Sequence, residues 1–292
     1  MTRSPISRRF GRYKMQHAAA YAIGAALHRA PPFPSASDNN RIQTLARRIT
    51  QCAVSTTLKI ATPPGDATHI VYRNKRRCRS GLCPPCARKR AWETVKRIAA
   101  VLDAVIVASP DMRFALLTLT SRNMPIEAVS DMLRLQESAM ARFFRAKAVR
   151  NALQGHVTGI EIAIRSEDGN WQAGVHSHSL AALCDSYFDR TKPIYLSQRA
   201  IVDLWRAALR VDYKPICHIR AIPNSDAAHA SLTECLKYAV APHRLFERDN
   251  GGFSVDPLVA AHLANALYKR RMCRTAGVFS KPRRPNAEGT AV

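Results

Sequence analysis

Short apolar runs alternate with longer helix-like patterns through the middle of the chain. Residues 114–120 (FALLTLT) form an apolar run of residue types that favour strands. Beyond Pro125, which suits a first helical turn, apolar residues recur at helical spacing from Val129 to Phe144. Residues 157–164 then alternate between apolar and polar side chains, which predicts a second strand.

A tight turn is predicted at Asp168-Gly169, a dipeptide typical of two-residue β-hairpins. The chain then returns as a strand over residues 171–183. Ser197 is a good N-cap for a helix that runs to Ala207. The remaining predicted elements are a strand and two helices, over residues 216–222, about 226–240 and 258–272.

The predicted order of elements, β-α-β-β-α-β-α, indicates an α+β fold. It is the ferredoxin-like split βαβ arrangement, an antiparallel sheet with helices on one face. We expect four regions: a flexible basic arm (1–50), a small Cys-rich zinc module (51–100), a catalytic domain (101–245), and a C-terminal helix with a basic tail (246–292). The arm has nine Lys or Arg residues, one acidic residue and several prolines.

Charge narrows the class of partner. The chain has 45 Lys and Arg against 21 Asp and Glu, a net charge of +24. Such a surplus favours nucleic acid first and an anionic membrane surface only as a distant alternative, because no sustained basic amphipathic helix is evident. No run is long and apolar enough to span a bilayer. Eight cysteines in 292 residues fit a reducing cytoplasm better than a disulfide framework.

Two histidines on the second hairpin strand are candidate metal ligands. His176 and His178 point to the same face of a strand because the side-chain period is two. Counting back from the turn places Glu161 opposite His176 in one register and opposite His178 in the other. Paired strand histidines alone are more often surface residues. With Glu161 they suit a divalent cation with open positions, which is Mg²⁺ or Mn²⁺ where the substrate is a phosphate.

A second pair of candidates lies on the predicted helix over residues 226–240. Glu234 and Tyr238 are four residues apart and therefore share a helix face. A metal, a phenol and a carboxylate suit phosphodiester cleavage: the tyrosine attacks, and the carboxylate activates water or a DNA hydroxyl later. Lys237 adds positive charge but projects about 100° away from Tyr238. By local sequence alone, Tyr238 would be read as an ordinary amphipathic-helix residue.

The cysteines of the second region indicate a structural zinc site. Cys78, Cys83 and Cys86 have suitable spacing for three of four ligands. We predict Cys52 as the fourth ligand, with His69 as the alternative, and rank free buried cysteines behind both. Basic residues surround the cluster and are expected, with Lys237, to contact DNA phosphates: Arg76, Arg77, Arg79, Arg88, Lys89 and Arg90.

Taken together, these motifs resemble the rolling-circle plasmid replication initiators (Rep) of the HUH endonuclease superfamily. The strand at residues 114–120 resembles the first motif of the family, VHSHSL (175–180) its metal motif, and ECLKY (234–238) its tyrosine motif. The resemblance spans roughly residues 52–242, and the family has a comparable Cys-rich segment with an upstream cysteine placed like Cys52. Two positions depart from the pattern: Ser177 replaces a bulky core residue, and Ala241 stands near where a second lysine is usual.

The resemblance implies a specific activity. His176, His178 and Glu161 would bind the cation, and Tyr238 would nick one origin strand, leaving a 5′-phosphotyrosine and a free 3′-OH. Glu234 would later activate the water that ends replication, and host helicase and polymerase would be partners. Two alternatives stay open: an HUH transposase or relaxase with the same chemistry, told apart by genetic context, and a non-catalytic zinc-dependent DNA-binding regulator.

Overall fold

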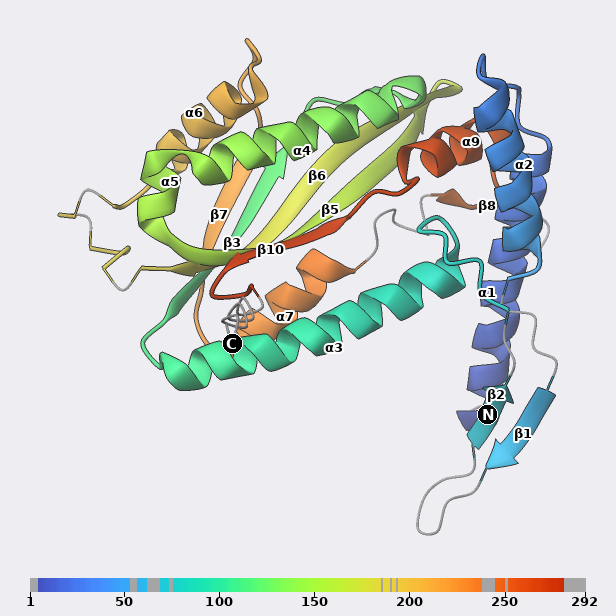
Figure 1. The fold of residues 1–292 in the computed structure, drawn as a ribbon, viewed down its shortest axis with the longest axis horizontal. Coiled ribbons are helices and arrows are strands. Elements are labelled where there is room, and N and C mark those ends of the chain that lie inside the picture. Colours follow the sequence, from blue (N-terminus) through green and yellow to red (C-terminus); the bar gives the residue numbers. More distant parts are fainter. Residues whose placement is uncertain are drawn as a thin grey trace, which may run out of the picture.

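A central antiparallel sheet organises the molecule. The computed structural model describes residues 5–52, 57–61, 69–73, 76–184, 186–189, 191–192, 194–237, 245–249 and 252–280. The sheet has the strand order β10-β5-β6-β3-β7, with β4 paired to β6 (Figure 1). Its strands are β3 (Arg113–Thr120), β4 (Met124–Pro125), β5 (Leu153–Glu167), β6 (Asn170–Leu183), β7 (Cys217–Ile222) and β10 (Cys273–Gly277). The predicted α+β antiparallel fold is confirmed.

The long β5–β6 hairpin has the tight turn that the sequence predicts. Asp168 and Gly169 both have positive φ angles, 49° and 80°, and Glu167 pairs with Asn170. This is the first of the two registers considered above, and it places Glu161 directly opposite His176. The register therefore fixes which face of the sheet the candidate ligands occupy.

Helices cover both faces of the sheet, which corrects the expectation of helices on one face (Figure 1). The helices α4 (Val129–Arg145), α5 (Lys147–Ala152), α6 (Gln198–Leu209) and α9 (Pro257–Ala266) belong to the core on one side, and a short 3₁₀ turn (Ile126–Ala128) precedes α4. The opposite face packs against α3 (Pro84–Ala108) and α7 (Ser225–Leu236). Because Phe114 and Leu117 lie on opposite faces of β3 and both are buried, each face needs its own apolar cover.

The N-terminal region is helical, so the prediction of a flexible basic arm over residues 1–50 is wrong. Helices α1 (Pro5–His28) and α2 (Ala36–Thr50) pack against each other and against α9. Buried apolar side chains line the α1–α2 contact, including Ile23 and Ile49. The prolines lie in the connection, and the Ser35 side chain caps α2 by accepting a hydrogen bond from the Asp38 amide.

Two small hairpins complete the described elements. The hairpins are β1 (Thr57–Ala61) with β2 (His69–Arg73), and β8 (Glu247–Asp249) with β9 (Gly252–Ser254). The helix predicted over residues 258–272 ends at Ala266, and the next segment becomes β10 at the sheet edge. The expected basic tail, residues 281–292, lies outside the described residues. Among the described helices, none combines the length and apolar character needed to cross a bilayer.

Candidate active site

Two adjacent strands, β5 and β6, place the predicted metal ligands on one face of the sheet. His176 on β6 pairs with Glu161 on β5, and His178 pairs with Gly159 on β5 and Thr118 on β3. Farther along the same face, Leu180 and Ala182 lie beneath α3 and α7. The polar half of this face is therefore the part that the two helices leave uncovered.

Glu161 and His178 face each other at short range. The His178 Nε2 lies 3.5 Å from the Glu161 Oε2, and about a fifth of each side chain is exposed. A hydrogen bond from His178 lowers the pKa of the Glu161 carboxyl, and positive charge on His178, Lys237 and His176 lowers it further. Glu161 is thus held as a carboxylate between three basic groups, which is the charge state that a divalent cation requires.

The other ring nitrogen of His178 contacts a strand neighbour. The His178 Nδ1 lies 3.2 Å from the Oγ1 of Thr118 on β3. A contact of this kind holds the orientation of the ring, with Nε2 directed toward Glu161. Sequence analysis placed Thr118 in the right strand but gave it no role. The period-two alternation of β3 already puts it on the histidine face.

His176 leans along its own strand. A Cβ atom on Gly174 would lie 3.2 Å from the His176 Nε2 and 2.2 Å from the Asn123 side chain, so only glycine leaves room for both groups. The Asn123 amide in turn contacts the guanidinium of Arg165. His218 on β7 lies one strand beyond Thr118 on the same face. Asn123 and His218 are further polar residues at the site that sequence analysis missed.

Helix α7 ends against this face of the sheet. A Cβ atom on Gly159 would lie 1.6 Å from the Cys235 carbonyl oxygen, so the glycine permits a direct backbone contact between β5 and α7. Glu234 and Lys237 form an ion pair at the exposed end of α7. The helix ends at Leu236, earlier than predicted. Tyr238, the next residue after Lys237, and Ala241 lie outside the described residues.

Ser177 has a polar partner beneath the histidines. Its side chain is fully buried, donates a hydrogen bond to the Leu119 carbonyl, and accepts one of 3.0 Å from the Gln136 amide of α4. Gln136 is also fully buried and donates to the same carbonyl. A serine–glutamine pair therefore fills the place that the family pattern gives to a bulky apolar side chain.

The four cysteines predicted to bind zinc lie together. Cys52 follows α2, Cys83 is the N-cap residue of α3, and Cys86 lies in the first turn of α3. With Cys78, their sulfur atoms all lie within 4.8 Å of one another, the only such set of three or more His, Cys, Asp or Glu ligands among the described residues. The side chain of the alternative ligand His69 lies outside the described part.

The sulfur geometry fits a metal. Cys86 Sγ lies 3.4 Å from Cys52 Sγ and 3.7 Å from Cys78 Sγ. A tetrahedral zinc site with Zn–S bonds of about 2.3 Å separates its sulfurs by roughly 3.8 Å. Hydrogen bonds with the Cys78 and Cys83 thiols lower the pKa of Cys52 to about 7. The cluster can hold a metal ion, and four thiolates are a typical donor set for structural zinc.

The chain matches the family model described as "Replication protein" over residues 69–291. It belongs to the rolling-circle plasmid Rep family. A relative named "Protein rep" from Streptococcus pneumoniae is 27% identical over 208 residues, which is 71% of this chain and 62% of the relative. Another "Protein rep", from Lactiplantibacillus plantarum, is 31% identical over 169 residues, 56% of this chain and 52% of the relative.

The Rep relatives are longer than the matched region, and this chain spans 62% and 52% of those two proteins. A Staphylococcus aureus "Protein rep" is 26% identical over 162 residues, 56% of this chain and 68% of the relative. No solved structure matches the chain significantly. The family assignment confirms the resemblance that the sequence motifs indicated.

The basic residues expected around the Cys cluster of this Rep chain are mostly exposed, with Arg77 partly buried. Arg76 donates a hydrogen bond to the Gln51 side chain, Arg77 to the Pro85 carbonyl and Arg90 to the Arg79 carbonyl. Lys89 pairs with Glu93 along α3. The contacts of Arg76, Arg77 and Arg90 hold these side chains against the segments that carry the cysteines. The conformation of the cluster therefore determines where their charges lie.

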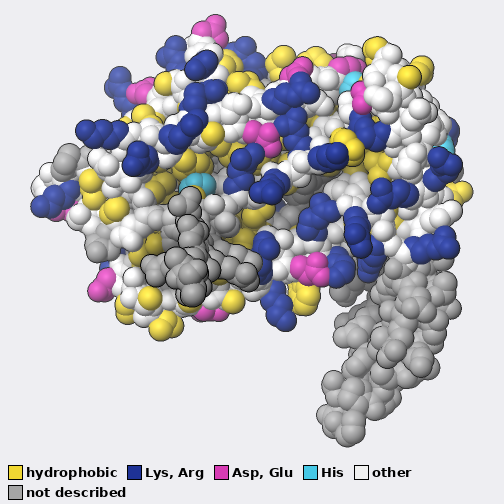
Figure 2. Space-filling view, viewed as in Figure 1, with side chains coloured by type: hydrophobic (Ala, Val, Ile, Leu, Met, Phe, Trp, Pro, Cys, Tyr) yellow, Lys and Arg dark blue, Asp and Glu magenta, His cyan; other side chains and the backbone are white. Residues whose placement is uncertain are grey.

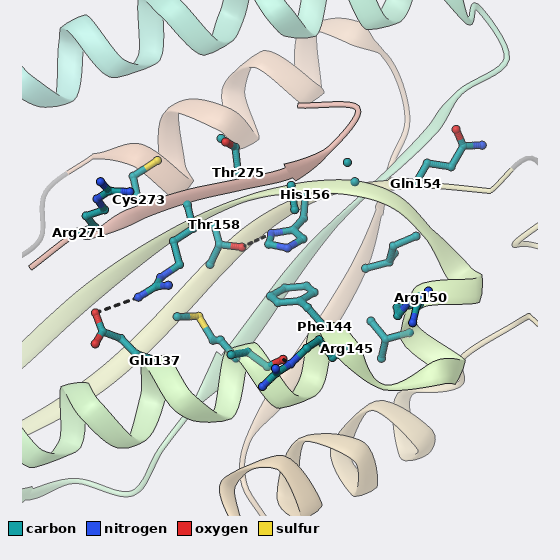
Figure 3. Close-up of a pocket in the computed structure, with 18 residues that line it drawn as sticks. Glu137, Phe144, Arg145, Arg150, Gln154, His156, Thr158, Arg271, Cys273 and Thr275 are labelled. Atoms are coloured by element: carbon teal, nitrogen blue, oxygen red, sulfur yellow. Dashed lines mark hydrogen bonds and ion pairs between the residues drawn. The ribbon is translucent and has the colours of Figure 1, made fainter. Parts of the chain in front are cut away.

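A cavity of about 880 Å³ lies on the opposite side of the sheet from His176 and His178, between α4, α5, β5 and β10 (Figure 3). Phe144 and His156 stack inside it, with ring centroids 3.6 Å apart. Burial lowers the pKa of His156 to about 4. None of the predicted catalytic or metal-binding residues lines this cavity.

Proposed function

We propose that the protein is a plasmid rolling-circle replication initiator that nicks one strand of its origin by tyrosine transesterification. One observation carries the proposal: the β5–β6 register sets Glu161 opposite His176 and beside His178, close to Lys237, the residue that follows α7. Family membership supports the replication role. The tyrosine chemistry rests on Tyr238, the residue that follows Lys237 in the chain.

The donor types suit a hard divalent cation, and the geometric support is the shared sheet face and the 3.5 Å between His178 and Glu161. Two imidazole nitrogens and a carboxylate would come from His176, His178 and Glu161, which share one sheet face. When bound, Mg²⁺ or Mn²⁺ would supply Lewis-acid polarisation of the scissile phosphate. The pKa of Glu161 is already lowered by the neighbouring basic groups, so the carboxylate needs no deprotonation step before it can act as a ligand.

Side chains of the protein would then make and break the bonds. The Tyr238 phenolate oxygen attacks the phosphorus, and the bond to the 3′ oxygen breaks, which leaves a 5′-phosphotyrosine and a free 3′-OH. Lys237 provides positive charge next to the nucleophile in sequence. In the terminating step, Glu234 removes a proton from water, whose oxygen attacks the phosphotyrosine and releases the tyrosine. The 3′-OH would prime the host polymerase after a host helicase separates the strands.

The test compares the parent protein with Tyr238→Phe on supercoiled DNA of its own replicon in Mn²⁺, followed by a denaturing gel. We expect protein-linked DNA with the parent and none with the variant. Tyr21→Phe is the control, because this exposed tyrosine of α1 belongs to none of the predicted motifs. Glu161→Gln should also abolish the adduct, whereas Glu234→Ala should form it and fail to release it.

Other outcomes would redirect the interpretation. An adduct with Tyr238→Phe would move the nucleophile to another residue. No adduct with the parent, under conditions where it binds DNA, would favour the non-catalytic zinc-dependent regulator. Nicking only at inverted ends or a transfer origin would favour the transposase or relaxase.

A further inference from the structure

A basic cleft lies where α2, the Cys cluster and the end of α9 meet. Its volume is about 560 Å³. Six cationic side chains line it, and no carboxylate does: Arg41, Arg48, Arg79, Arg90, Lys269 and Arg270. Figure 2 shows Lys and Arg side chains gathered on the side of the molecule where α9, α2 and the start of α3 lie. Only Arg79 and Arg90 were among the expected DNA-contacting residues.

We propose that this cleft binds the sugar–phosphate backbone of single-stranded DNA. The inference rests on the proposed function, because it supplies the strand that the candidate nicking site would cut. Nothing in the sequence motifs assigns a role to α2 or α9. Their cations reach the cluster only in the folded chain.

Most of the positive charge in the cleft is not neutralised. Arg41 pairs with Asp38 at 2.7 Å and Arg270 with Glu137 at 2.6 Å. Within the described residues, no carboxylate pairs with the other four cations. Of these four, Arg48 and Arg90 donate hydrogen bonds to backbone carbonyls of the Cys segment. Those bonds orient the guanidinium groups and leave their charges available for phosphate.

One donor in the cleft has no acceptor among the described groups. The Nη1 of Arg41 is buried and makes no hydrogen bond, although Nη2 contacts Asp38 and Asn265. A buried donor left unsatisfied costs roughly 1–3 kcal/mol. Arg41 therefore keeps hydrogen-bonding capacity beyond its contacts with Asp38 and Asn265.

Two cations of the cleft stand on strained backbone. Arg79 and Lys269 have φ angles of 60° and 54°, in the left-handed region that favours glycine. Such residues cost of order 1 kcal/mol each and cluster at functional sites. The chain keeps long cationic side chains at two positions where glycine would fit the backbone better.

The shape and neighbours of the cleft favour a single strand. Tyr268 is half exposed beside it, with the Arg41 guanidinium 4.3 Å from the ring centroid, and offers a surface on which a base can stack. The cleft shares Arg90 and Arg270 with an adjoining cavity of about 300 Å³, whose lining reaches Lys237 at the end of α7. Basic residues therefore continue from the cleft toward the candidate nicking site.

Glycine substitutions test the cleft without straining the fold. Arg79→Gly/Lys269→Gly removes two charges at positions where glycine tolerates the backbone angle. Arg210→Gly is the matched control: it has a φ of 61°, ends α6, and lines none of these cavities. Binding of fluorescein-labelled dT20 to the zinc-loaded proteins is followed by anisotropy across a salt series, without Mg²⁺ or Mn²⁺.

We expect the double variant to bind dT20 roughly tenfold more weakly. Each phosphate contact contributes about 0.7 to the slope of log K against log salt for single strands, so the slope should fall by about 1.4. Arg210→Gly should match the parent. An unchanged affinity and slope, or an equal loss in Arg210→Gly, would overturn the proposal. Loss on a 20-base-pair duplex with dT20 binding intact would do so as well.

This measurement is separate from the nicking test. It needs no catalytic metal and can be repeated with Tyr238→Phe throughout. If Tyr238 is not the nucleophile, the binding result still stands. If the cleft does not bind DNA, the adduct assay is unaffected.

Discussion

At the scale of single residues, the Thr118 hydroxyl is the group that sets the His178 ring. Its Oγ1 lies 3.2 Å from Nδ1, while Nε2 faces Glu161. Thr118→Val keeps the shape and removes the hydroxyl, so the ring loses its orienting partner. We expect Mn²⁺ to bind roughly tenfold more weakly in calorimetric titration, because loss of such partners weakens metal affinity by about 10–100-fold.

Thr120→Val is the control for the Thr118 prediction. Thr120 lies on the same strand face, but its hydroxyl donates to the Ile216 carbonyl. Its removal should leave Mn²⁺ affinity near that of the parent. Equal binding by Thr118→Val and the parent would mean that the sheet alone holds the ring.

Among single residues, the sequence predicted those positions that follow from the hairpin and its alternation of side chains. The turn near Asp168-Gly169 and the period of two were enough to put Glu161 on the histidine face, and the structure selects the pairing with His176. Cys spacing likewise selected Cys78, Cys83 and Cys86, and the resemblance to the Rep family supported Cys52 as the fourth member of the cluster. The Ser177–Gln136 hydrogen bond could not be predicted from the sequence, because it joins β6 to α4, and the two elements meet only in the folded protein.

At the scale of elements, Phe144 of α4 stacks on His156 of β5. Burial makes protonation of this histidine unfavourable. Burial lowers the pKa of His156 to about 4, below its ordinary value of 6.5. A folded-state pKa below that of the unfolded chain adds stability above pH 6.5, and this stability is lost as the pH falls toward 4. The protein should therefore lose about 2 kcal/mol between pH 7.5 and 5 through this group.

His156→Phe isolates that contribution. Phenylalanine can still stack on Phe144 but cannot titrate, so its unfolding free energy in urea should fall about 2 kcal/mol less than the parent's over the same pH range. His28→Phe, at an exposed position, should keep the parent's pH dependence. If parent and His156→Phe show the same pH dependence, the ring titrates normally in the fold.

The elements that sequence analysis missed share one cause. Basic and proline-rich composition suggested a flexible arm, yet α1 and α2 pack against each other and bury apolar side chains such as Ile23 and Ile49. The helix predicted over residues 258–272 ends at Ala266, and residues 273–277, for which no element was predicted, pair with β5 at the sheet edge. In both places tertiary contacts override a weak local preference.

For the whole molecule, the Cys cluster is the junction between the N-terminal helices and the sheet. It joins the end of α2 to the start of α3, and α3 packs beneath the sheet with α7. Arg48 and Arg90 bond to backbone carbonyls of the same segment and line the basic cleft. Metal loss should therefore disturb the cleft before it disturbs the sheet.

Cys52→Ser tests this order of events. Native mass spectrometry should count one zinc ion in the parent and none in the variant, because a structural site needs four ligands. Amide hydrogen exchange should then rise in residues 36–52 and 78–90, while the β5–β6 hairpin, which has apolar cores on both faces, keeps its protection. Affinity for dT20 should fall when the zinc is lost, since Arg48 and Arg90 then lose the backbone carbonyls that orient them.

Cys184→Ser provides the matched comparison, because Cys184 lies outside the cluster and its thiol donates to the Asn151 carbonyl. It should retain zinc, protection and DNA affinity. A Cys52→Ser protein that still holds one zinc would make another residue, such as His69, the fourth ligand. If instead protection fell equally in the cluster and in the hairpin, the metal would support the whole fold, and the cleft could not be separated from the sheet as a metal-dependent part of the molecule.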